Sequence, residues 1–131
     1  MIFLDTSGIY ALADIDDSNH QAAVDAFQAA QNEGRRIVTS NYVLVESAAL
    51  LQRRLGHKSA LALLRDASKF DLTWITPEIH AQGIRRLDKA GSSKVSLVDA
   101  ISFVVMRMRG MDTYLGFDRH FEDEGFRRVL S

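Results

Sequence analysis

Short apolar runs of strand length alternate along this chain with longer stretches of helical periodicity, and this alternation restricts the folds available to it. Strands that alternate with helices predict a parallel sheet covered by helices on both faces. The pattern does not fix the order of the strands in that sheet. Strands are expected at residues 2–4, 36–39, 72–75, 113–117 and 126–130, helices at 6–13, 20–32, 41–55, 59–70, 77–89 and 97–109, and a polar loop at 91–94.

The composition excludes several classes of protein. With 131 residues, 47% of them hydrophobic and 25% charged, the chain suits one globular domain over residues 1–131. The absence of cysteine excludes disulfides, thiolate zinc sites and cysteine nucleophiles. No apolar run reaches membrane-spanning length, so we expect a cytoplasmic protein that is not bound to a membrane. The formal net charge of -1 neither requires nor excludes a nucleic-acid partner.

Four carboxylates stand where the expected elements begin or end. Asp5 and Asp118 directly follow strands, whereas Glu46 and Asp99 lie in the first turns of helices. The carboxyl ends of parallel strands meet at one edge of a sheet, so we expect all four side chains to converge there. Crowded carboxylates raise one another's pKa unless cations compensate. The pattern therefore predicts a divalent-metal site with oxygen ligands, which is most often used for phosphate chemistry.

Each carboxylate also has a structural interpretation. Asp5 and Asp118 are placed to cap the segments that follow them, and residues 96–99 match a capping box that ends in an aspartate. Glu46 shares a helix with Arg53 and could pair with it. Taken singly, these interpretations compete with a site on even terms. Taken together, four unrelated caps at one sheet edge explain the pattern less well than a single site does.

Hydroxyl side chains accompany the carboxylates. Thr6 and Ser7 follow Asp5, and Thr39 and Ser40 end the second expected strand. We expect these hydroxyls to orient the carboxylates or a metal-bound water. For Ser40, ordinary helix capping is the stronger alternative.

Other catalytic motifs are missing from the sequence. A haloacid-dehalogenase-like phosphatase needs a second aspartate two residues after Asp5, where this chain has Ser7. There is no glycine-rich phosphate loop and no Gly-x-Ser-x-Gly elbow. The four histidines have no metal-ligand spacing, and only His120, close to Asp118, is placed to reach a substrate.

Four segments resemble the motifs of PIN-domain ribonucleases, and specifically of the VapC-like toxins of bacterial toxin–antitoxin pairs. They are FLDTS at residues 3–7, VTSNYVLVE at 38–46, LVDA at 97–100 and GFDRHF at 116–121. Their order, their spacing and the total length all fit, so the resemblance covers essentially the whole chain. One departure is Gly116, where the family often has a hydroxyl residue, which predicts the loss of one supporting contact.

The resemblance implies a PIN-like three-layer α/β/α sandwich with a mainly parallel sheet of four to five strands. It implies that Asp5 and Asp99 are the principal Mg²⁺ or Mn²⁺ ligands. Glu46 and Asp118 would complete the site directly or through water, with Asp118 the most variable of these positions. Arg119, next to the last motif, is the first candidate for a contact with a substrate phosphate.

The implied activity is metal-assisted hydrolysis of RNA phosphodiester bonds by the toxin of a toxin–antitoxin pair. Such a protein would have an RNA substrate, a cognate antitoxin and a second copy of itself as partners. Two alternatives keep the same fold: a nuclease without an antitoxin, and a catalytically silent domain that binds RNA or protein. Retention of all four carboxylates argues against the silent domain, because it has no need of mutually repelling acids.

Overall fold

Five parallel strands form one sheet at the centre of the computed structural model, which describes residues 1–90 and 94–129. The order of the strands is β3-β2-β1-β4-β5, and every neighbouring pair is parallel. The expected polar loop at 91–94 and the last residue of the strand expected at 126–130 lie largely outside the described residues. The strands are β1 (Ile2–Leu4), β2 (Ile37–Ser40), β3 (Asp71–Thr73), β4 (Thr113–Leu115) and β5 (Arg127–Arg128).

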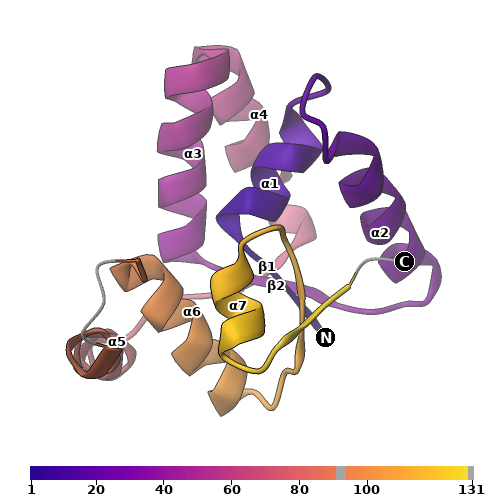
Figure 1. Cartoon of the computed structure of the whole chain (residues 1–131). Helices are drawn as coiled ribbons and strands as arrows, with labels where there is room; N and C mark the ends of the chain where they lie inside the picture. Colours follow the sequence, from indigo (N-terminus) through magenta and orange to yellow (C-terminus); the bar gives the residue numbers. More distant parts are fainter. Residues whose placement is uncertain (91–93, 130–131) are drawn as a thin grey trace.

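Helices cover both faces of this sheet, as the sequence predicts. The helices α1 to α4 lie on one face and α5 to α7 on the other, the upper and lower parts of Figure 1. No helix among the described residues is both long and apolar enough to cross a membrane. The helices are α1 (Thr6–Ala13), α2 (His20–Asn32), α3 (Asn41–Leu55), α4 (His57–Asp66), the 3-10 helix η1 (Ala67–Lys69), α5 (Pro77–Ala90), α6 (Leu97–Met108) and α7 (Arg119–Asp123).

The register of the central strands sets the position of the site. Phe3 of β1 lies opposite Val38 of β2 on one side and opposite Tyr114 of β4 on the other. The three strands therefore end level with one another, and Asp5 leaves β1 between the ends of β2 and β4. Its backbone N–H still donates to the carbonyl of Leu115, at 3.3 Å, so the ladder continues into the site.

A group of buried aromatic rings fixes the segment after β4. Phe121 is fully buried, stacks on Tyr114 with 4.8 Å between ring centroids, and meets Phe103 edge to face at 5.0 Å. The sequence predicts no helix between residues 117 and 126, but residues 119–123 form a short helix. Burial of Phe121 stabilises this helix, which is too short to persist alone. The same contacts hold Asp118, which precedes α7, at the sheet edge.

The connection between α3 and α4 differs from the expected one. A single residue, Gly56, ends α3 and begins α4, with a φ of 102° that favours glycine. Helix α4 therefore begins at His57 instead of residue 59. It ends at Asp66, and η1 takes the place of the expected last turns.

Candidate functional site

Asp5 is the most buried of the predicted site carboxylates, with 5% of its surface exposed. Its Oδ1 caps helix α1, accepting the backbone N–H of Gly8 at 2.9 Å and the hydroxyl of Ser7 at 2.8 Å. Burial raises the pKa of Asp5 to about 7, although these two hydrogen bonds oppose the rise. The nearby charges of Asp118 and Asp99 raise it further.

Asp99 and Ser96 form a complete capping box at the start of α6. The Ser96 hydroxyl accepts the N–H of Asp99 at 3.1 Å, and Asp99 Oδ2 accepts the N–H of Ser96 at 3.3 Å. Burial raises the pKa of Asp99, and the charge of Asp118 adds to the rise. The hydrogen bond from Ser96 and the neighbouring imidazole of His120 act in the opposite direction.

Asp118 begins α7 and faces Asp99 across the sheet edge. Its Oδ1 accepts the backbone N–H of His120 at 2.9 Å. The Nδ1 atom of His120 lies 3.1 Å from Asp118 Oδ1 and 3.4 Å from Asp99 Oδ2. Ligand atoms of these three residues all lie within 4.8 Å of one another, so they could share a metal ion. His120 therefore contacts two of the four predicted site carboxylates.

Glu46 joins the group from helix α3. Its Oε1 accepts a 2.7 Å hydrogen bond from the hydroxyl of Thr6, which lies 40 positions earlier in the chain. The sequence left open a pairing of Glu46 with Arg53; within the part of the chain that the structure describes, the contact is with Thr6 instead. This hydrogen bond links the first turn of α1 to α3 beside Asp5.

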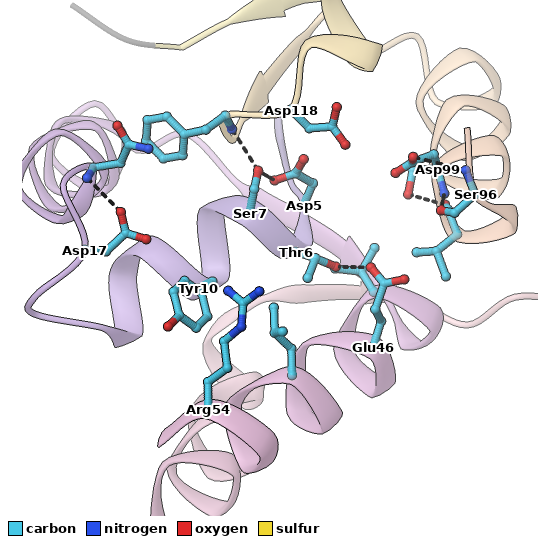
Figure 2. Close-up of a pocket in the computed structure, with 16 residues that line it drawn as sticks. Asp5, Thr6, Ser7, Tyr10, Asp17, Glu46, Arg54, Ser96, Asp99 and Asp118 are labelled. Atoms are coloured by element: carbon cyan, nitrogen blue, oxygen red, sulfur yellow. Dashed lines mark hydrogen bonds between the residues drawn. The ribbon is translucent and has the colours of Figure 1, made fainter. Parts of the chain in front are cut away.

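The four carboxylates line one cavity of about 400 Å³, at the predicted sheet edge. Figure 2 shows Asp5, Asp99 and Asp118 around one open space, with Glu46 and its partner Thr6 beside it. Asp5, Asp99 and Asp118 cap helices as the structural interpretation suggested, and they also share the cavity. Capping and convergence are therefore compatible, because helices entered from this edge begin at the cavity.

Each of the four carboxylates has one oxygen that forms hydrogen bonds or ion pairs within the described part of the protein. Among the described residues, hydrogen bonds and ion pairs reach Oδ1 of Asp5 and Asp118, Oδ2 of Asp99 and Oε1 of Glu46, and not the second oxygen. The second oxygens are therefore available to a ligand. An all-carboxylate donor set of this kind fits a hard divalent cation such as Mg²⁺ or Mn²⁺.

The four predicted supporting hydroxyls divide into two pairs. Thr6 and Ser7 donate to carboxylates, as expected, and Ser7 Oγ also accepts the N–H of Phe117 at 2.8 Å. Thr39 instead donates to the carbonyl of Leu4 at 2.7 Å. Ser40 caps α3 by accepting the N–H of Val43, at 3.2 Å. The expectation that Thr39 orients the carboxylates is corrected, because its hydroxyl donates to a backbone carbonyl instead. Ser40 forms the helix cap that was the stronger alternative for it.

Gly116 has a role that the sequence did not suggest. A Cβ atom at this position would lie 2.1 Å from Oδ1 and 2.6 Å from Cγ of Asp5. Glycine therefore leaves the space in which the Asp5 carboxylate sits. The sequence interpretation considered only a missing hydroxyl here, whereas the effect of the glycine is steric.

Some residues of the cavity were missed by sequence reasoning. Tyr10, Asp17 and Arg54 line it, whereas Arg119, the predicted phosphate contact, is exposed at the start of α7 and does not belong to the lining. Arg54 was recognisable only as part of the helical face of α3 that repeats through residues 43, 46, 50 and 54.

The chain matches the family model described as PIN domain over residues 2–126. A relative, the 23S rRNA-specific endonuclease VapC20 of Mycobacterium tuberculosis strain H37Rv, is 34% identical over an alignment of 131 positions that covers 98% of each chain. The crystal structure of Mycobacterium tuberculosis VapC20, described as a sarcin-ricin loop cleaving toxin, superposes with a TM-score of 0.91 at 32% identity and covers 100% of both chains.

Two more distant solved structures share the fold. FitAcB from Neisseria gonorrhoeae gives a TM-score of 0.68 at 16% identity, over 98% of this chain and 96% of that one. PAE2754 from Pyrobaculum aerophilum gives 0.65 at 21% identity, over 98% and 88%. The predicted fold and family are confirmed. The chain belongs to the PIN domain family and is a homologue of the VapC20 endonuclease.

Proposed function

We propose that this protein is a divalent-metal-dependent endoribonuclease and the toxin of a toxin–antitoxin pair, working as one domain over residues 1–131. One observation carries the proposal. Four carboxylates from four separate segments line one cavity, and each keeps an oxygen that no described residue reaches by a hydrogen bond or ion pair. The relative that is 34% identical over nearly the whole chain is named a 23S rRNA-specific endonuclease, and the VapC20 crystal structure is described as that of a sarcin-ricin loop cleaving toxin. We therefore propose an rRNA loop as the substrate class.

Asp5 and Asp99 would hold Mg²⁺ or Mn²⁺ as principal ligands, and Glu46 and Asp118 would complete the site directly or through water. A bound cation of this kind lowers the pKa of a water nucleophile and screens charge on the phosphate. The hydrogen bonds from Gly8, Ser7 and Thr6 keep the carboxylates in place before the substrate arrives. Such preorganisation avoids a reorganisation cost during the reaction.

Sequence preference would come from unpaired bases, because single-stranded loops expose the base edges that A-form RNA hides. Arg119, exposed at the start of α7, remains our candidate for a contact with a phosphate on the outer side of the site. We further propose that the protein acts in the cytoplasm, forms a homodimer and is neutralised by an antitoxin encoded beside it. A nuclease without an antitoxin would lack such a neighbouring reading frame.

The proposal is tested with purified protein and 23S rRNA, or a hairpin that carries its sarcin-ricin loop. Cleavage is expected with Mg²⁺ or Mn²⁺, and not with EDTA. Asp5→Asn and Asp99→Asn should each remove it, whereas Asp25→Asn, on an exposed face of α2, should cleave like the wild type. Unchanged cleavage by Asp99→Asn would remove that residue from the site. No cleavage of any RNA by the wild type would favour the silent, binding-only domain.

A further inference from the structure

Arg54 brings a positive charge into a cavity whose other charged lining residues are all acids. It is the one lysine or arginine among the described residues that line this cavity, facing Asp5, Asp17, Glu46, Asp99 and Asp118. Within the described part of the chain, Arg54 forms no ion pair with a carboxylate. The hydrogen bond from Tyr10 lowers the pKa of Asp14, the charge of Arg54 lowers it further, and the Arg54 guanidinium interacts with the Tyr10 side chain. Because Arg54 is exposed and a guanidinium has five N–H donors, the remaining donors are available to an anionic ligand.

The position of Arg54 is set by helix α3 and by a tyrosine of helix α1. Glu46 and Arg54 lie eight residues apart on one face of α3, so about 12 Å separates them along the helix axis. The guanidinium carbon lies over the ring of Tyr10, 5.2 Å from its centroid. The Tyr10 hydroxyl in turn donates to Asp14 Oδ2 at 2.7 Å, which fixes the ring. Figure 2 shows Arg54 beside Tyr10, at the end of the cavity away from Asp99.

A separation of this size has a consequence for the ligand. Arg54 lies at the end of the cavity away from Asp99 (Figure 2), so we do not assign it to the phosphate that the carboxylates would bind. An RNA strand that follows the cavity would instead bring a phosphate of a flanking nucleotide to Arg54. A guanidinium is well suited to such a contact, because its planar fork of N–H donors matches the oxygens of a phosphate.

We propose that Arg54 binds the phosphate of a nucleotide that flanks the cleaved bond, and so directs the RNA strand along α1 and α3. This inference rests on the proposed ribonuclease function. A phosphate contact carries no sequence information, so its loss should weaken binding to all RNAs alike.

The neighbouring residue provides a matched control. Arg53 and Arg54 both lie in the last turn of α3 and are both exposed, so they have the same long-range charge and the same effect on the helix dipole. Only Arg54 lines the cavity. A difference between Arg53→Gln and Arg54→Gln therefore reports the cavity contact.

Binding is measured by fluorescence anisotropy at several salt concentrations, in Mg²⁺ and in the Asp99→Asn background so that the RNA stays intact. Arg54→Gln should weaken binding of a target hairpin and of an unrelated single strand by about fivefold each. It should also reduce the slope of log K against log salt by about 0.7. Arg53→Gln should change neither quantity, and Arg54→Lys should keep the slope. Thermal melting should show all variants folded.

Three results would overturn the inference. The first is that Arg54→Gln and Arg53→Gln have the same RNA affinity and the same salt slope. The second is that Arg54→Gln loses affinity for one RNA sequence only. The third is that Arg54→Lys reduces the salt slope as much as Arg54→Gln does. If the wild type cleaves RNA while any of these is seen, the inference fails and the proposed function stands. If the Asp99→Asn parent binds no RNA, the inference fails, and the proposed function fails with it only if the wild type also cleaves none. If RNA binding depends on Arg54 but the wild type does not cleave, only the proposed function fails.

Discussion

Asp5→Asn should stabilise the metal-free protein, and increasingly so as the pH rises. Burial raises the pKa of Asp5 from 3.8 to about 7, so the folded state binds the proton more tightly than the unfolded chain does. The stabilising contribution of the Asp5 proton is therefore complete below about pH 4 and is lost as the pH rises from there to about 7. The full difference in pKa corresponds to roughly 4 kcal/mol. Of this, roughly 3 kcal/mol should be lost between pH 5 and pH 8.

The asparagine variant isolates this effect, because its amide oxygen can still accept the hydrogen bonds of Gly8 and Ser7, and asparagine is a good helix cap. The assay is thermal or urea unfolding in EDTA at pH 5 and pH 8, with Asp25→Asn as the control. The melting temperature of the wild type should fall by about 10 °C relative to Asp5→Asn over this range. Adding Mg²⁺ at pH 8 should raise the melting temperature of the wild type more than that of Asp5→Asn.

Two results would refute this reasoning. If the melting temperatures of the wild type and of Asp5→Asn differ by the same amount at pH 5 and pH 8, the buried carboxylate ionises without a cost in stability. A wild type that is more stable than Asp5→Asn at pH 8 in EDTA would mean that the charged form is a favourable cap and nothing more.

Further predictions concern the groups that position the carboxylates. Gly116→Ala should lower the rate of metal-dependent cleavage at least tenfold, because the added Cβ would displace the Asp5 carboxylate. Single-turnover kinetics measure this rate, and a wild-type rate in the variant would contradict the prediction. Thr6→Val should reduce cleavage severalfold, with unfolding free energy changed by no more than about 0.5 kcal/mol, because it frees Glu46 at a partly exposed position. Thr39→Val should do the reverse: urea unfolding should show a loss of about 1 to 2 kcal/mol, with Mn²⁺ affinity unchanged. A Thr39→Val protein of normal stability but weak Mn²⁺ binding would restore the original role given to this hydroxyl.

The sequence predicted those parts of the fold that follow from local periodicity. All five strands and the six longer helices were located. Each has apolar residues at a spacing of two or 3.6 positions, and this spacing can be read from a short stretch of sequence. The order of the strands was not readable, since it depends on contacts between distant segments. Helix α7 was missed for the same reason: five residues carry too little periodicity, and burial of Phe121 against Tyr114 decides their conformation.

The site follows the same division. The positions of Asp5, Glu46, Asp99 and Asp118 relative to strand ends were enough to predict that they share an edge. What each hydroxyl contacts was not predictable, because side-chain partners are set by geometry of a few tenths of an ångström. The steric role of Gly116 and the cavity position of Arg54 depend on how β4 approaches β1 and how α3 approaches α1. No single segment of the sequence contains that information.

The claim that four separated carboxylates form one cation site is tested most directly by the anomalous scattering of Mn²⁺ in crystals of the wild-type protein. A Mn²⁺ peak is expected in the cavity, within coordination distance of the Asp5 carboxylate and of at least one carboxylate from Asp99, Glu46 or Asp118, and Asp5→Asn should weaken it. A cavity without a peak at saturating Mn²⁺, or a peak held only by residues outside this group, would contradict the account.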